Sequence, residues 1–142
     1  MEVYVSSHRL TSDAALAAAE GAIAKARDLG VKINVAVVDA GGHLLAFRRD
    51  DSASLPSIVI AQDKAYTSVG FRTSSRNLAE RISADPDVRD GIVKQPRLAA
   101  FPGGLPILVE GQVVGGIGVS GASADQDEEC AEAGLVAIGL ST

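Results

Sequence analysis

Apolar residues recur at helical spacing in several stretches of the chain, and sequence signals mark where these stretches begin and end. In the first stretch, four apolar residues between positions 16 and 26 share one stripe of a helix. Thr11 or Ser12 can cap its start and Gly30 can end it. The pattern predicts a first helix that runs to about Asp28.

Three further helices are indicated. The second begins at Ser54 and Pro56 and ends near Gly70, and the third is capped by residues 73–75 and continues through Ile82. The last runs from Ala124 to about Leu140. A capping box is expected there, because Ser123 and Gln126 have the required spacing.

Four stretches, in two pairs, alternate or are continuously apolar over strand lengths. Residues 31–39 and 43–49 flank the Gly41–Gly42 turn, and residues 107–110 and 113–120 flank a turn at Gly111. Each pair predicts a β-hairpin. Gly115, Gly116 and Gly118 carry no side-chain bulk, so another backbone or a flat ligand can approach the last strand closely.

Residues 84–104 show the least regular pattern, which suggests a binding loop or a subunit contact. The predicted order is α-β-β-α-α-loop-β-β-α, in which hairpins replace βαβ crossovers. We therefore expect an α+β fold with helices packed on a central antiparallel sheet, in a single domain spanning residues 1–142.

Composition narrows the function classes. The 142 residues carry a formal charge of −5, which argues against nucleic acid or an anionic membrane as the main partner. No run approaches transmembrane length and the first residues show no export signal, so a cytoplasmic location is expected. The single Cys130 excludes an internal disulfide and a cysteine-based zinc site.

Five segments, taken in order, resemble one known family. They are Val37-Val-Asp-Ala-Gly-Gly-His-Leu44, Arg49-Asp-Asp-Ser-Ala53, Ala61-Gln-Asp-Lys-Ala-Tyr-Thr67, Phe101-Pro-Gly-Gly-Leu-Pro-Ile107 and the stretch from Gly115 to Gly134. This series is similar to the GlcG/HbpS-like proteins, which include the C-terminal domain of PduO-type proteins.

The resemblance implies a profilin-like sandwich and assembly into homo-oligomers, often octamers. It also implies haem or a related tetrapyrrole as the ligand and cofactor, with haem-degrading or haem-sensing roles in some members. The fold that it implies agrees with the α+β order predicted from the residues.

Two histidines are candidates for chemistry. His43 opens the returning strand after a glycine turn, where a neutral imidazole can bind haem iron or act as a general base. His8, near the N-terminus, is the second candidate for the iron. The alternative for both is an exposed histidine without a role. Asp39 is expected to accept backbone amides in the turn.

A second set of residues is expected to bind the ligand. Arg49 and Lys64 can meet a carboxylate, either a haem propionate or a small organic acid, although Lys64 can also be simply solvated. Phe101 can lay its ring against a flat ligand. The glycines at the two glycine turns complete the set: Gly103, Gly104 and Gly121.

Three hypotheses follow. The first is a haem- or tetrapyrrole-binding protein with His43 on the iron. The second is a cofactor-independent isomerase, hydratase or lyase of a catabolic pathway, acting on a carboxylate or carbonyl compound, with Asp51, Glu128 or His43 moving the proton. The third is an accessory module that acts by assembly. Cys130 is interpreted as a packed thiol, with a thiolate ligand or nucleophile as the alternative.

Overall fold

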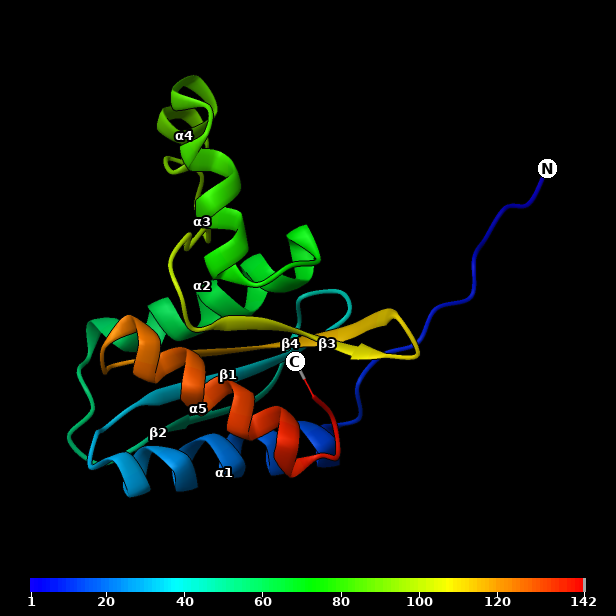
Figure 1. The fold of residues 1–142 in the computed structure, drawn as a ribbon. Coiled ribbons are helices and arrows are strands. Elements are labelled where there is room, and N and C mark those ends of the chain that lie inside the picture. Colours follow the sequence, from blue (N-terminus) through cyan, green and yellow to red (C-terminus); the bar gives the residue numbers. More distant parts are fainter. Residues whose placement is uncertain (142) are drawn as a thin grey trace.

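The computed structural model describes residues 1–141 as an α+β fold, which confirms the fold class predicted from the sequence (Figure 1). The strands form one antiparallel sheet in the order β2-β1-β4-β3. The elements in chain order are α1 (Ser12–Leu29), β1 (Asn34–Asp39), β2 (Leu44–Arg49), α2 (Pro56–Phe71), α3 (Ser75–Ser83), α4 (Pro86–Ile92), β3 (Gly104–Val109), β4 (Gln112–Ser120) and α5 (Ala124–Ala137).

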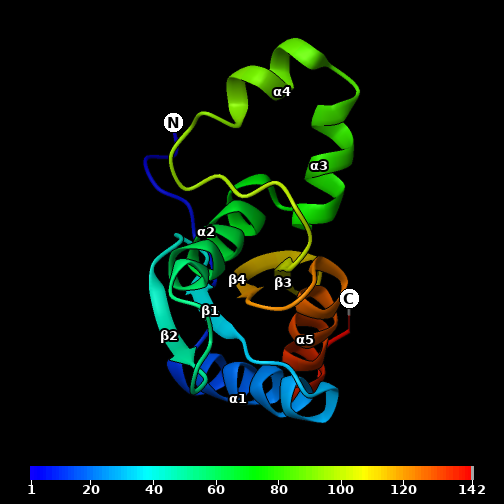
Figure 2. The same cartoon turned by 90° about the vertical axis from the view of Figure 1, so that its left-hand side faces the viewer.

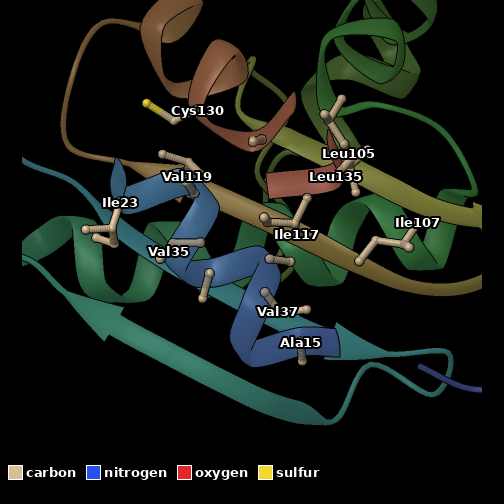
Figure 3. Packing of buried hydrophobic residues seen from close by; sticks show 14 of the residues in the cluster. Ala15, Ile23, Val35, Val37, Leu105, Ile107, Ile117, Val119, Cys130 and Leu135 are labelled. Carbon is tan, nitrogen blue, oxygen red and sulfur yellow. The ribbon is translucent and has the colours of Figure 1, made fainter. Parts of the chain in front are cut away.

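Helices cover both faces of the sheet (Figure 2). Helices α1 and α5 lie side by side on one face, and α2 lies on the other. The central strand β1 is buried along its whole length and serves both faces. Val35 and Val37 belong to the larger core with α1 and α5 (Figure 3), whereas Ala36 and Val38 pack toward α2.

The backbone of α2 lies directly on β4, which explains the glycines of that strand. A Cβ on Gly116 would be 2.7 Å from the carbonyl oxygen of Ala65, and a Cβ on Gly118 would overlap the carbonyl oxygen of Ala61. The sequence allowed either a backbone or a flat ligand at these glycines. The structure places a backbone there, so no ligand lies between α2 and β4.

The segment 84–104 corrects the sequence prediction, because it begins with a helix. Asp85 caps α4 by accepting hydrogen bonds from the amides of Asp87 and Val88, and Pro86 occupies the first turn. The Asp-Pro pair, interpreted as a break, is thus a helix start. Helix α4 has no buried residue, and α3 and α4 project away from the sheet (Figure 1). We call residues 75–98 the arm.

Other boundaries differ by a few residues. The C-terminal cap of α2 is Arg72, whose backbone is in the left-handed region at φ 55°. The helix therefore extends beyond Gly70, where the sequence predicted its end. Helix α5 ends at Ala137 rather than near residue 140, and its predicted capping box between Ser123 and Gln126 is present. Across residues 1–141, no helix combines the length and apolar character needed to cross a bilayer.

Candidate functional site

A hollow of about 860 Å³ lies at the end of the sheet near the β1–β2 turn. We call it the large hollow. Its walls are residues 6–8, the turn residues 40–42, the C-terminal part of α2 with its cap, and the β3–β4 turn. Glycines 41 and 42 form part of its lining, so the backbone itself is accessible there. Four separate segments of the chain thus meet around one opening.

The large hollow is lined by an arginine and a histidine and by uncharged side chains. Arg72 is exposed and is positioned as the cap of α2, where its amide donates to the carbonyls of Ser68 and Val69. The Nδ1 atom of His8 lies 3.2 Å from Oε1 of Gln112 on the β3–β4 turn. Among the described residues that form the walls there is no Asp or Glu. In a chain of net charge −5, this composition favours an anionic ligand.

His43 directly follows the lining residues Gly41 and Gly42 in the chain and is not itself part of the lining. Its Nδ1 lies 3.3 Å from Oδ1 of Asp39, which also accepts the backbone amides of Gly41 and His43 at 2.8 and 3.1 Å. The imidazole is 82% exposed, so Nε2 faces outward while Asp39 orients the ring. A carboxylate behind a histidine in this way holds the orientation of the ring.

The predicted turn role of Asp39 is confirmed by these amides, and its pairing with the His43 ring is an addition. Burial acts to raise the pKa of the Asp39 carboxyl. The amides of His43 and Gly41 outweigh that effect, so the pKa lies below its ordinary value. Asp39 is therefore a carboxylate that orients His43.

A second hollow, of about 440 Å³, adjoins the first and shares Tyr66 and Gly70 with it. Its outer wall is the end of the arm, from Ile92 to Leu98. The guanidinium carbon of Arg97 lies 3.5 Å from the centroid of the Tyr66 ring. The ring edge of Tyr66 also lies against Gly42, where a Cβ would come within 3.1 Å of it. Tyr66 therefore forms a partition between the two hollows.

Lys64 lies on the opposite side of α2 from solvent, and the prediction that it can be solvated is wrong. Its side chain is fully buried; the ammonium donates to the carbonyl of Val119 at 2.8 Å and to Oδ2 of Asp127 at 3.1 Å. The Phe101 ring centroid lies 4.5 Å from it. The other carboxylate oxygen of Asp127 accepts the amide of Ala122. This pair joins α2, β4 and α5.

Burial opposes charge on both members of the pair. It lowers the pKa of Lys64 and raises that of Asp127, and in each case the attraction between the two groups works in the other direction. The partners of Lys64 already surround its ammonium. The side chain is inaccessible to solvent and lines neither hollow, so it does not reach a ligand carboxylate in this arrangement.

The three predicted glycines and Phe101 lie against protein rather than against a hollow. Added Cβ atoms on Gly103 and Gly104 would meet atoms of Lys64 at 2.7 and 2.5 Å, and one on Gly121 would meet the carbonyl of Lys32 at 2.7 Å. Phe101 covers Lys64 and is half-exposed. The structure thus packs these glycines against α2 and the loop before β1.

The remaining predicted residues are dispersed. Arg49 donates to the carbonyl of Ala53, Asp51 is exposed on the following loop, and both oxygens of Glu128 accept from Arg76 at 3.1 Å. None of the three lines the large hollow. Arg49 and Lys64 have different partners, so the expected joint carboxylate site of these two residues is not formed.

Cys130 is buried in the core between α5 and the sheet. Burial, followed by the charges of Asp127 and Glu129, raises the pKa of its thiol to about 11. A thiol of that pKa stays protonated near neutral pH. The interpretation of Cys130 as a packed thiol is confirmed.

Three residues of the hollows were not among the sequence candidates: Tyr66, Arg72 and Arg97. Arg72 and Arg97 share one unusual trait, a positive φ at a non-glycine residue, of 55° and 67°. Sequence patterns do not report that trait. Tyr66 does lie within one of the family-like segments, which was the available signal.

Comparison with known proteins agrees with this fold. A protein family described as "Haem degrading protein HbpS-like" matches residues 10–136. A protein of Citrobacter freundii, described as an uncharacterized 15.0 kDa protein in the dhaT-dhaS intergenic region, is 34% identical over 127 residues. The aligned part is 89% of this chain and 89% of that protein. The family resemblance predicted from the sequence is thereby confirmed.

Two solved structures extend the comparison. A double mutant of HbpS from Streptomyces reticuli is 37% identical, with a TM-score of 0.85, covering 94% of this chain and 89% of that one. A crystal structure described as a complex of PduOC with heme is 28% identical, with a TM-score of 0.84, covering 94% of this chain and 98% of that one. In both cases the similarity extends over most of the two chains.

Proposed function

The chain belongs to the HbpS-like family of haem-degrading proteins, and on this premise we propose that it binds haem in the large hollow. The observation that carries the proposal is the lining of that hollow. Gly41, Gly42, Arg72 and His8 belong to this lining, and none of the described residues that form it is an Asp or a Glu. The haem complex of the similar PduOC domain supports the same ligand class.

The residues of the large hollow fit a flat, anionic macrocycle. Its volume of about 860 Å³ falls within the usual range for ligand and cofactor sites. Val69, Leu108 and Val113 provide apolar surface, and the side-chain-free turn at Gly41 and Gly42 lets a planar group approach the backbone. Arg72 can meet a propionate with two parallel hydrogen bonds, which the planar guanidinium favours.

His43 is our first choice for the iron ligand. Its ring is oriented by Asp39 through Nδ1, which leaves Nε2 available to the iron, and His43 directly follows the lining residues Gly41 and Gly42 in the chain. His8 lines the hollow and is the second choice. When bound, haem supplies an iron centre whose reactivity depends on its axial ligand and on the polarity around it. The protein contributes the orientation of the histidine and the anchoring of the carboxylates.

A haemin titration followed by absorbance tests the proposal. We expect a saturable Soret band in the wild-type protein, a loss of most of the band shift in His43→Ala, and a smaller change in His8→Ala. If His8→Ala loses the band and His43→Ala does not, the ligand assignment is wrong. Weak, unsaturating binding that neither variant changes would contradict haem binding itself. Ascorbate added to the complex then tests for haem breakdown.

We also propose that the protein forms a homo-oligomer, an octamer as the family resemblance implies. Apolar side chains are exposed on two projecting parts, Val3 and Val5 of the N-terminal segment and Val88 and Val93 of the arm. Such residues are commonly covered in subunit contacts. Light scattering at micromolar concentration measures the mass directly, and a monomer would contradict this part of the proposal.

The second candidate function is cofactor-independent proton transfer on a small carboxylate or carbonyl compound. The Asp39–His43 pair favours it, since a histidine oriented by a carboxylate is a common general base. Turnover of such a substrate should fall strongly in His43→Ala. Activity that persists in this variant would exclude His43 as the base.

A further inference from the structure

The second hollow has the lining of a site for a small apolar anion. The rings of Tyr66 and Phe71 and the side chain of Ile92 provide apolar surface. The polar side chains are those of Arg97, Gln95 and Thr67. Along the part of the chain that the structure describes, no carboxylate contributes to this lining. One cation in a mostly apolar hollow of about 440 Å³ is a simple arrangement for binding one negative group.

Arg97 is held in place by a hydrogen bond to its backbone carbonyl and by the contact of its guanidinium with the Tyr66 ring, not by an acidic partner. The carbonyl of Arg97 accepts the Thr67 hydroxyl at 3.1 Å, and the same hydroxyl accepts the amide of Ala99 at 3.0 Å. These contacts fix Arg97 at φ 67°, a conformation that costs a non-glycine residue energy. The guanidinium face lies on the Tyr66 ring at 3.5 Å, so the N–H groups at its edge remain directed outward in its plane.

The acidic residue that interacts electrostatically with Arg97 is Asp63, which lies one turn before Tyr66 on α2. Burial raises the pKa of the Asp63 carboxyl, and the positive charge of Arg97 works against that rise. The two side chains form no ion pair, and Arg97 takes part in none of the ion pairs found within residues 1–141. The bidentate edge of the guanidinium is therefore unused.

We propose that the second hollow is a separate binding site for a small aromatic carboxylate, with Arg97 binding the carboxylate and Tyr66 and Phe71 contacting the ring. Arg97 can donate two parallel hydrogen bonds to a carboxylate in the plane of its guanidinium. Gln95 can add a further donor at the rim. The site lies on the far side of the Tyr66 partition from the large hollow, so its occupation does not depend on haem.

Benzoate is a suitable probe, and benzamide is its uncharged counterpart of nearly the same shape. We would titrate each into isotope-labelled protein without haem and follow the backbone amide resonances. Benzoate should give saturable shifts confined to residues 63–71 and 92–98, with a dissociation constant on the order of 1 mM, as expected for so small a ligand. Benzamide should give no saturation over the same range.

The variants isolate the guanidinium. Arg97→Gln should weaken benzoate binding at least tenfold, whereas Arg89→Gln, an exposed arginine of the same arm paired with Asp90, should bind as the wild type does. Arg97→Gly serves if Arg97→Gln disturbs the fold, because glycine accepts the positive φ while lacking the charge. Equal binding of benzoate by Arg97→Gln, equal binding of benzamide, or shifts located elsewhere would each overturn the site. A haemin titration of the same variants should match the wild type.

Discussion

The Lys64–Asp127 pair and the two arginines of the hollows, Arg72 and Arg97, carry charge in opposite surroundings. Lys64 is wholly buried and surrounded by a carbonyl, a carboxylate and an aromatic ring. The arginines are exposed, fixed through their backbones, and have unused donors. The comparison separates charge that stabilises the fold from charge that is available to a ligand. A choice of candidate cation by burial alone would have selected Lys64, whose ammonium already has partners within the protein.

The largest effect is expected at the buried pair. Lys64→Met leaves the Asp127 carboxylate buried without its cation, which typically costs about 3–5 kcal/mol of unfolding free energy. Urea unfolding measures this cost. The matched control is Lys25→Met, because Lys25 forms an exposed pair with Glu129, and such pairs contribute about 0–1 kcal/mol. Similar losses in the two variants would show that the buried pair is not a structural element.

A smaller, pH-dependent effect is expected at Asp39, which precedes the lining residues 40–42 of the large hollow. Because the pKa of Asp39 in the folded state lies below its ordinary value of 3.8, the unfolded state binds the proton more readily. The resulting stabilisation is complete above the ordinary value and is lost as the pH falls through the lowered pKa. Asp39→Asn lacks it, so the difference in unfolding free energy between the two proteins should shrink only as the pH falls below 3.8. A constant difference would contradict this account.

The smallest effect on stability is expected at Arg72. Arg72→Gly should change the unfolding free energy by no more than about 1 kcal/mol, because glycine suits its positive φ. It should nevertheless weaken haemin binding about tenfold, since it removes a charged hydrogen-bond donor. Glu110→Gly is the matched control, as Glu110 also has a positive φ, of 52°, and does not line the large hollow. If both variants bind haemin equally, Arg72 is not an anchor.

Most of the fold could be predicted because its signals are local. The strand alternation around Gly41–Gly42 and Gly111, and the capping box of α5, depend on neighbouring residues. Helix α4 was missed because its pattern is short and shows no buried face. The Asp85–Pro86 signal was present but was interpreted as a break rather than as a helix start.

The site was predictable only in part because its contacts join distant segments. His43 became a candidate through its position after a glycine turn, whereas the partner of Lys64 lies 63 residues further along the chain. Nothing near Lys64 in sequence indicates Asp127. The position of Arg97 over Tyr66 likewise depends on how the arm returns to α2. Such pairings follow from tertiary packing, which no local period describes.

The lack of any buried residue in α4 also bears on how the arm can move. A segment that hides so little apolar surface can open and close many times while the central strands β1 and β4 stay paired. Each opening would remove the wall that the end of the arm contributes to the second hollow. That hollow would then be complete only while the arm is closed. The rate at which the arm closes would then set how quickly a molecule can be trapped there.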